Sequence, residues 1–253
     1  MGILEIKHCT KRFGGLVAVK DLTMSLHPGD LYGLIGPNGA GKTTVFNLIT
    51  GVYMPDEGSI ELDGKSIHRQ KPSAIARLGM SRTFQNIRLF QSMTVLENVK
   101  LARHMRKKQG LVDALVRTRH LKEEEKEVER DAMELLKIFN LDNRAHELAC
   151  NLPYGFQRRL EIARALATKP KVLLLDEPAA GMNPQEAREL MRLIQWSRDQ
   201  FHITILLVEH NMQVVMGVCE KIQVIDYGET IALGSPKEIQ DDPKVIEAYL
   251  GGA

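Results

Sequence analysis

Hydrophobic residues along this chain follow two different spacings. Short runs that are almost entirely apolar, and so suited to buried strands, occupy residues 31–35, 172–175 and 203–208. Residues 45–49 and 185–199 instead place apolar residues at helical spacing, and each is predicted to be a helix that follows or precedes such a strand. Because buried strands that alternate with helices form parallel sheets, we predict an α/β fold with a mainly parallel sheet.

Strict alternation of apolar and polar residues marks a second kind of strand. Residues 3–6 and 58–64 show this alternation on either side of the first strand–helix segment. Near the end of the chain, residues 221–225 and 230–233 are joined across Tyr227-Gly228, which is typical of a hairpin. We therefore predict an N-terminal antiparallel β-subdomain and a closing hairpin.

The stretch from residue 86 to residue 150 has another character. It contains few β-branched runs and many charges. One helix is predicted there because apolar residues recur at i, i+4, i+7, i+8 and i+11, namely at Val128, Ala132, Leu135, Leu136 and Phe139. The charged face of this helix is expected to be solvated.

We predict a single domain over residues 1–253, built from three consecutive parts. Residues 1–85 contain the β-subdomain and the first part of the core, and residues 86–165 form a helical subdomain insert. Residues 166–253 supply the rest of the core with the C-terminal hairpin and helix. A chain of 253 residues can bury one large core with a modest subdomain.

Composition excludes some kinds of partner. The chain has 34 basic and 32 acidic residues and a formal net charge of +2, so no nucleic-acid partner is expected. Cys9, Cys150 and Cys219 are odd in number and widely spaced, which favours neither a disulfide framework nor a zinc site and fits a reducing, cytosolic compartment. There is no charged-then-apolar leader, and the apolar runs are far shorter than a membrane span. We expect any membrane association to depend on a partner.

The clearest chemical signal is a phosphate-binding loop. Residues 36–43 read Gly-Pro-Asn-Gly-Ala-Gly-Lys-Thr and stand between a predicted strand and a predicted helix. Glycines let backbone N–H groups turn toward anionic oxygens, Lys42 adds a positive charge, and the Thr43 hydroxyl can ligate Mg²⁺. We therefore predict a nucleoside triphosphate ligand, and we assign to its binding Gly36, Pro37, Asn38, Gly39, Ala40, Gly41, Lys42, Thr43 and Thr44.

Acidic residues and a histidine follow two other predicted strands. Asp176 and Glu177 come directly after the run 172–175, and His210 follows 203–208. Ligands of open α/β sheets sit beyond the carboxyl ends of the strands, so these groups are expected to converge on the triphosphate. Asp176 is predicted to hold Mg²⁺, and Glu177 to orient the attacking water. Lys42 is expected to neutralise charge on the transferring phosphoryl group, and His210 to contact the γ-phosphate.

Two further residues are weaker candidates. The amide of Gln85 could accept a hydrogen bond from water or coordinate Mg²⁺ where the core joins the helical insert. Phe13, in a chain with few aromatic residues, could stack on adenine. Packing in the core is the rival interpretation for Phe13.

Residues 151–164 read Asn-Leu-Pro-Tyr-Gly-Phe-Gln-Arg-Arg-Leu-Glu-Ile-Ala-Arg and precede the acidic strand. With this segment the chain resembles ATP-binding cassette (ABC) proteins over essentially its whole length. Residues 151–159 correspond to the family's signature motif. The phosphate loop, Gln85, this signature, the acidic strand and His210 follow one another in the family's order. The segments 82–90, 93–98 and 245–251 make it similar to the ATPase subunits of bacterial branched-chain amino acid importers. The resemblance implies a P-loop NTPase core that binds ATP and Mg²⁺ and hydrolyses ATP.

The resemblance also implies an assembly. Two cassettes, identical or different, would form a head-to-tail dimer that holds each ATP between one subunit's phosphate loop and the other's signature. The signature residues expected to contact that ATP are Tyr154, Gly155, Phe156 and Gln157. Gly155 opens a predicted helix, whose N–H groups and dipole suit a γ-phosphate.

The same resemblance implies partners in a membrane. The helical insert would move with Gln85 and contact integral membrane permease subunits through a groove near residues 88–90. The chain would then be peripheral, on the cytoplasmic face of a bacterial inner membrane, and would act indirectly with an extracytoplasmic solute-binding protein.

Two positions depart from the pattern of the wider family. Pro153 replaces the signature serine and so lacks both a hydroxyl and an N–H, which would cost about 1.5 to 3 kcal/mol if no other donor substitutes. We therefore expect a weaker ATP-dependent dimer at this site. Asn183 stands where the family usually has an aspartate, which puts communication between subunits through a carboxylate in doubt.

Other functions compete with amino acid import. The nearest alternatives are cassettes for lipopolysaccharide or urea transport. A cassette ATPase of DNA repair or translation is a more distant alternative, since the chain has no second cassette, long coiled-coil arm or basic groove. A P-loop kinase or GTPase would leave the signature unexplained, and the chain contains no Asn-Lys-x-Asp motif for reading guanine.

Overall fold

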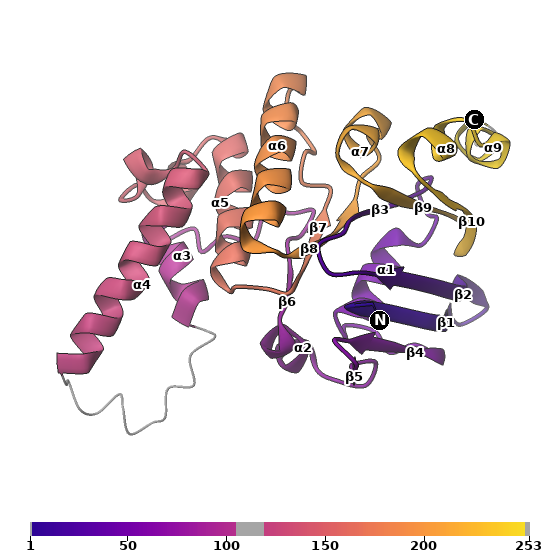
Figure 1. Ribbon diagram of the computed structural model, residues 1–253, viewed down its shortest axis with the longest axis horizontal. Helices are drawn as coiled ribbons and strands as arrows, with labels where there is room; N and C mark the ends of the chain where they lie inside the picture. Colours follow the sequence, from indigo (N-terminus) through magenta and orange to yellow (C-terminus); the bar gives the residue numbers. More distant parts are fainter. Residues whose placement is uncertain (1, 105–118, 251–253) are drawn as a thin grey trace. The chain divides into compact units, whose positions relative to one another are not determined.

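A computed structural model describes residues 2–104 and 119–250 of this chain (Figure 1). The chain forms two compact units. One contains residues 1–82 together with 171–253, and the other contains residues 83–170.

The first unit contains an antiparallel sheet with strand order β2-β1-β4-β5. Its strands are β1 (Leu4–Phe13), β2 (Leu16–Leu26), β4 (Glu57–Leu62) and β5 (Lys65–Ser66). In β1, Leu4 pairs with Leu26 of β2 and with Leu62 of β4, and all three side chains are buried. The predicted antiparallel layer is therefore confirmed, although the sequence pattern did not predict β2.

A second sheet in the same unit has six strands in the order β10-β9-β3-β8-β7-β6. Its strands are β3 (Leu31–Ile35), β6 (Met80–Arg82), β7 (Val172–Asp176), β8 (Thr204–Val208), β9 (Lys221–Asp226) and β10 (Glu229–Gly234). Strands β9, β3, β8, β7 and β6 pair in parallel, and β10 pairs antiparallel with β9. The predicted parallel core and closing hairpin are confirmed. Every residue of β3, β7 and β8 is buried, which explains why their sequences are almost entirely apolar.

Six helices of this unit fall within the described residues. They are α1 (Lys42–Ile49), α2 (Pro72–Leu78), α6 (Pro184–Phe201), α7 (Met212–Val218), α8 (Pro236–Gln240) and α9 (Pro243–Leu250). Helix α1 begins three residues before the predicted helix, because the phosphate loop leads directly into its first turn. Asn183 is the N-cap of α6, and its side chain accepts hydrogen bonds from the N–H groups of Gln185 (3.0 Å) and Glu186 (2.9 Å).

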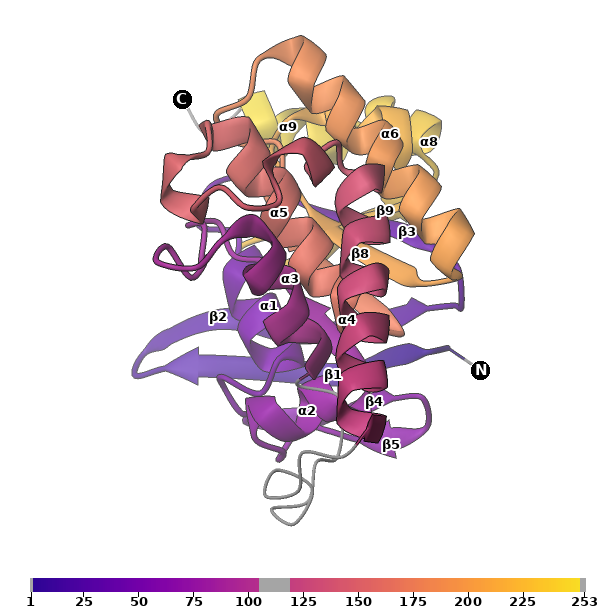
Figure 2. The same ribbon diagram turned by 90° about the vertical axis from the view of Figure 1, so that its left-hand side faces the viewer.

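The unit formed by residues 83–170 is helical over its described part. It contains α3 (Val95–His104), α4 (Arg119–Ile138), two short 3₁₀ turns (Asp142–Arg144 and Ala149–Asn151) and α5 (Tyr154–Ala167). Figure 2 shows α3, α4 and α5 side by side. The predicted apolar stripe is the buried face of α4, since Val128, Ala132 and Leu136, together with Phe139 directly after the helix, are at most 1% exposed. In the described part of the whole chain, no helix combines the length and the apolar character that crossing a bilayer requires.

Candidate nucleotide-binding site

The predicted catalytic groups of the first unit follow three neighbouring strands. Strands β3, β8 and β7 are adjacent in the parallel sheet, and their carboxyl ends lie at the same edge (Figure 1). The phosphate loop and Lys42 follow β3, Asp176 ends β7 with Glu177 next, and His210 comes two residues after β8. The sheet topology thus brings together residues that are more than 130 positions apart in the sequence.

The phosphate loop is shaped by its glycines. A Cβ atom added to Gly36 would lie 2.0 Å from the carbonyl oxygen of Ile225 in β9, and one added to Gly41 would lie 2.4 Å from the carbonyl oxygen of Ala18 in β2. Gly41 also has φ of 102°, a left-handed conformation that glycine adopts without strain. No other residue fits either position without moving the neighbouring strand.

Lys42 lies inside the loop that it belongs to. Its ammonium group donates hydrogen bonds to the carbonyl oxygens of Gly36 (2.6 Å) and Pro37 (2.8 Å), and the residue is 8% exposed. Burial lowers the pKa of Lys42, while the charges of Glu177 and Asp176 act to raise it.

Glu177 and His210 form a pair at the edge of the sheet. The His210 Nδ1 atom lies 3.5 Å from Oε1 of Glu177, and the side chains are 56% and 17% exposed, respectively. The backbone N–H of Glu177 donates to the carbonyl oxygen of Val208 (2.9 Å), which joins the ends of β7 and β8. Glu177 has φ of 47°, so the chain turns sharply as it leaves β7.

Asp176 is held by an arginine that sequence reasoning did not select. Its Oδ2 atom accepts a hydrogen bond from Nη2 of Arg82 at 2.9 Å, and both side chains are 8% exposed. Arg82 reaches it because β6 lies beside β7, with Arg82 paired to Leu174. No local sequence pattern indicates this contact, because Arg82 and Asp176 are 94 residues apart and β6 was not predicted.

The residues present fit a Mg²⁺ ion that completes its shell with water and phosphate oxygens. Asp176 offers a carboxylate at the strand end, and Thr43 offers a hydroxyl in the first turn of α1. Among the described residues, no cluster of three or more His, Cys, Asp or Glu side chains could hold a metal by itself. Mg²⁺ in nucleotide sites is usually bound by one or two protein groups together with substrate phosphates, so such a cluster is not required.

A cavity of about 840 Å³ lies beside the phosphate loop. Residues 36–40 and His210 line one part of it, and Tyr227, Lys244 and Tyr249 line another. The volume is within the range of small-molecule sites. The contribution of α9 to this cavity could not be read from the sequence pattern.

Phe13 lies at the end of β1 and is 42% exposed. Its ring makes an edge-on contact with Tyr53 at 5.1 Å between centroids, and the Lys11 ammonium lies 5.5 Å from the ring centroid. The contact with Tyr53 packs one edge of the ring, while the exposed fraction leaves area for a flat base. Stacking of Phe13 on adenine remains a prediction.

Glu209 is a buried residue that sequence reasoning left without a role. It is 1% exposed and lies between Val208 and His210 in the chain. Its Oε1 atom accepts the backbone N–H of Ala179 at 3.0 Å, two residues after Glu177. Burial raises the pKa of Glu209. Glu209 therefore joins the segment that follows Glu177 to the end of β8.

In the helical unit, the signature segment and the Gln85 segment are joined by a buried network. Arg158 of α5 donates to the carbonyl oxygens of Phe84 (2.8 Å) and Gln85, and to the Tyr154 hydroxyl (3.1 Å). Glu161 lies 3.4 Å from Arg158 and accepts the N–H of Arg88 (3.2 Å). In the sequence, this network is visible only as two charged residues, Arg158 and Glu161, at helical spacing.

The start of α5 is close to the prediction. The helix begins at Tyr154, one residue before the predicted Gly155, with Pro153 as its N-cap. The Pro153 carbonyl accepts the N–H groups of Phe156 (2.9 Å) and Gln157 (3.0 Å). Contacts of Gln85 and of residues 154–157 with a nucleotide remain predictions, since these residues belong to the unit 83–170.

A glycine-rich loop that ends in a lysine, between a buried strand and a helix, with acidic residues at the end of another parallel strand of the same sheet, defines a P-loop nucleotide-binding protein. The family described as ABC transporter matches residues 19–180, and the family described as branched-chain amino acid ATP-binding cassette transporter matches residues 229–253. The chain belongs to the ABC transporter family.

Individual relatives agree with this family. The high-affinity branched-chain amino acid transport ATP-binding proteins LivG of Escherichia coli (strain K12) and BraF of Pseudomonas aeruginosa are each 46% identical to this chain, covering 99% of it and 98% of the relative. The crystal structure of the ADP conformation of MJ1267, an ATP-binding cassette of an ABC transporter, matches with a TM-score of 0.85 and 33% identity, covering 99% of each chain. The lipopolysaccharide export protein LptB of Escherichia coli (strain K12) is 34% identical over 99% of this chain.

Proposed function

We propose that this chain is the ATP-hydrolysing subunit of an importer that takes up branched-chain amino acids through separate membrane permease subunits. The observation that carries the ATPase mechanism is the placement of Lys42, Asp176, Glu177 and His210 at one edge of the sheet, on three adjacent strands. The solute class is supported by relatives that are 46% identical over 99% of the chain, against 34% for the lipopolysaccharide export protein. The alternative of lipopolysaccharide transport is therefore less well supported.

Each residue of the site has a proposed task. The backbone of the phosphate loop binds the triphosphate, and the Lys42 ammonium exchanges its contacts with loop carbonyls for contacts with phosphate oxygens. Thr43 and Asp176 would hold Mg²⁺, which when bound neutralises charge on the phosphates. Glu177 orients and polarises the attacking water, and His210, 3.5 Å from it, contacts the γ-phosphate.

Residues of the helical unit complete the proposal. The signature residues 154–157 would contact an ATP molecule held by a second cassette, and Gln85 would join the metal shell. The working pair of cassettes would be a homodimer or a heterodimer with a related chain. The permeases would contact the segment 88–90. The chain would lie on the cytoplasmic face of the membrane, and an extracytoplasmic protein would deliver the solute.

The catalytic part of the proposal is tested by Glu177→Gln. The amide keeps the shape of the side chain and removes its charge, so ATP binding should stay within about threefold while turnover falls at least about 100-fold. Glu134→Gln on the exposed face of α4 is the matched control and should hydrolyse ATP normally. Normal turnover in the Glu177 variant would remove this residue from the catalytic role.

The transport part is tested by affinity purification from gently solubilised membranes. Permease subunits should co-purify with the chain, and vesicles that contain the purified complex should accumulate labelled leucine only with ATP. An exclusively soluble complex would reject a transport role. A complex that moves another solute but not leucine, isoleucine or valine would reject the solute assignment alone.

A further inference from the structure

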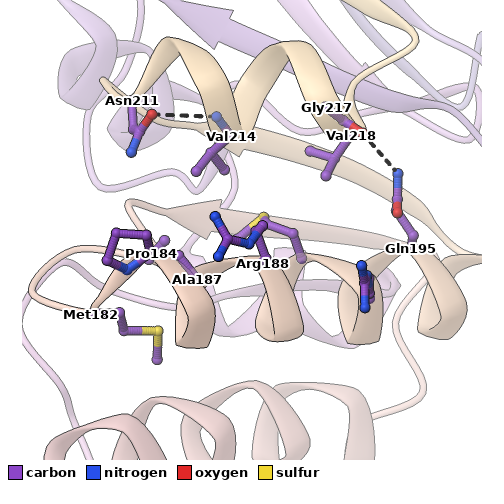
Figure 3. A pocket seen from close by; sticks show the side chains of 12 residues that line it. Met182, Pro184, Ala187, Arg188, Gln195, Asn211, Val214, Gly217 and Val218 are labelled. Atoms are coloured by element: carbon purple, nitrogen blue, oxygen red, sulfur yellow. Dashed lines mark hydrogen bonds between the residues drawn. The ribbon is translucent and has the colours of Figure 1, made fainter.

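A second cavity lies between α6 and α7 in the unit that contains both sheets (Figure 3). Its volume is about 400 Å³, within the range of small-molecule pockets. It is separate from the cavity beside the phosphate loop, and the two have no lining residue in common. The proposed ATPase mechanism does not use it.

The lining of this cavity combines an aliphatic floor with positive charge. Ala187 and Met191 are buried on α6, and Val214 and Val218 face them from α7. Arg188 lies between the two helices in Figure 3, and Arg192 follows one turn later on α6. None of the twelve residues that line the cavity is acidic or aromatic.

The two arginines have no protein partner in the part of the chain that the structure describes. Neither Arg188 nor Arg192 forms an ion pair or a hydrogen bond with a side chain or backbone group of residues 2–104 or 119–250. Arg198, farther along the same helix, instead contacts both Glu220 (2.5 Å) and Asp199 (2.8 Å). Two like charges at i and i+4 repel each other, so an anion held by both would relieve this repulsion.

The cavity is connected to the proposed catalytic pair. Its lining residue Ala179 follows Glu177 by two positions, and Asn211 is the residue after His210. Glu209 joins these two segments by accepting the Ala179 N–H at 3.0 Å. Asn211 in turn accepts the N–H of Val214 at 3.3 Å, at the start of α7. A ligand that holds α6 against α7 therefore acts on both segments that carry the catalytic side chains.

We propose that this cavity binds a small aliphatic carboxylate and that binding changes the rate of ATP hydrolysis. The planar guanidinium groups of Arg188 and Arg192 match the geometry of a carboxylate. The valine, methionine and alanine side chains suit a compact aliphatic body, and the lack of an aromatic lining residue disfavours a nucleobase. Binding itself does not depend on the proposed transport function, whereas the effect on hydrolysis depends on the proposed ATPase site.

Binding is tested with 4-methylpentanoate and its neutral analogue 4-methylpentanamide. Isothermal titration and saturation-transfer NMR on the full chain should show that the carboxylate binds and that the amide binds at least about fivefold more weakly. Arg188→Gln and Arg192→Gln should each weaken carboxylate binding to a similar extent. Arg77→Gln, an exposed arginine on α2 outside the cavity, is the matched control and should leave binding unchanged. Unchanged melting temperatures would show that the variants are folded.

The regulatory part is read from the ATPase rate with and without the carboxylate. A change in rate that disappears in the Arg188→Gln/Arg192→Gln double variant supports the proposal. Equal binding of acid and amide, or binding that survives the double variant, would overturn the assignment of the ligand class. If neither probe binds, or if the double variant only weakens association with another protein chain, the cavity is not a small-molecule site. A third outcome is that the carboxylate binds and both arginine substitutions weaken its binding, but that neither the wild-type chain nor any variant hydrolyses ATP. This outcome would count against the proposed ATPase function and not against the cavity.

Discussion

Replacing Arg158 with leucine should destabilise the helical unit strongly. Arg158 and Glu161 are each 2% exposed, and Arg158 donates to two backbone carbonyls and to the Tyr154 hydroxyl. Leucine removes these donors and leaves the Glu161 carboxylate without its buried counter-charge. Breaking a buried ion pair from one side costs about 3 to 5 kcal/mol, which is a large part of the total stability of about 5 to 15 kcal/mol typical of proteins.

The controls for this prediction come from the same helix. Glu161→Gln removes the negative charge but keeps an acceptor for Arg158 and for the Arg88 N–H, and Arg158 keeps its two backbone carbonyls, so the free energy of unfolding should fall by less than it does in Arg158→Leu. Arg159→Leu changes a half-buried arginine next to Arg158 and should cost less than about 1 kcal/mol.

The assay is urea unfolding followed by far-UV circular dichroism, with ATPase rate measured on the same samples. Arg158→Leu should shift the midpoint to lower urea, and hydrolysis should fall because the Gln85 segment loses its attachment to α5. A midpoint equal to that of the wild-type chain would show that the network contributes no net stability. Equal costs for Arg158→Leu and Arg159→Leu would show that burial of the pair does not set the magnitude.

Three further predictions concern single positions. Asn183→Ala should lower the free energy of unfolding by about 1 kcal/mol because α6 loses its N-cap, whereas Asn183→Asp should keep the cap and stay within about 0.5 kcal/mol; equal midpoints in urea for all three proteins would contradict this. Burial raises the pKa of Glu209, so its contribution to stability is complete below the carboxyl pKa of the unfolded chain and is lost as the pH rises through the higher folded value. Glu209→Gln should therefore flatten the stability profile above the unfolded carboxyl pKa of about 4.3, and a profile parallel to wild type would oppose this. Pro153→Ser should tighten ATP-dependent dimerisation measured by analytical ultracentrifugation in the Glu177→Gln background, in which hydrolysis is expected to be slow; unchanged or weaker dimerisation would show that no donor is missing at this position.

Sequence reasoning located the parts of the fold that have a strong local pattern. Strands β3, β7 and β8 were visible because burial on both faces requires continuous apolar runs. Strand β6 was missed because it has only three residues, and its place in the sheet depends on pairing with β7, ninety positions later. Strand β2 was missed because its pairing with β1 is interrupted by register shifts, which break the simple alternation.

The candidate site shows the same division. The phosphate loop, Asp176 and Glu177 could be selected because each motif is contiguous in the sequence and has a stated chemistry. The contacts of Arg82 with Asp176 and of Glu209 with Ala179 could not be selected, because they join strands through the tertiary fold. Asn183 was interpreted through its departure from a family pattern, whereas the structure shows that it also caps α6.

The close fit of Gly36 and Gly41 against neighbouring strands shows that residues of one motif are constrained for two different reasons, packing of the fold and binding of the ligand. Both glycines are required by the packing of the apoprotein, because any side chain there would meet the backbone of β9 or β2. Lys42 is under no such packing requirement at its ammonium end, which donates to the carbonyl oxygens of Gly36 and Pro37 in its own loop. In a descendant of this chain that no longer bound a nucleotide, we would expect the two glycines to be conserved and the lysine to be replaced by other residues. In such a lineage, conserved glycines would indicate only that the fold is retained. A conserved lysine would indicate that the site still binds a nucleotide.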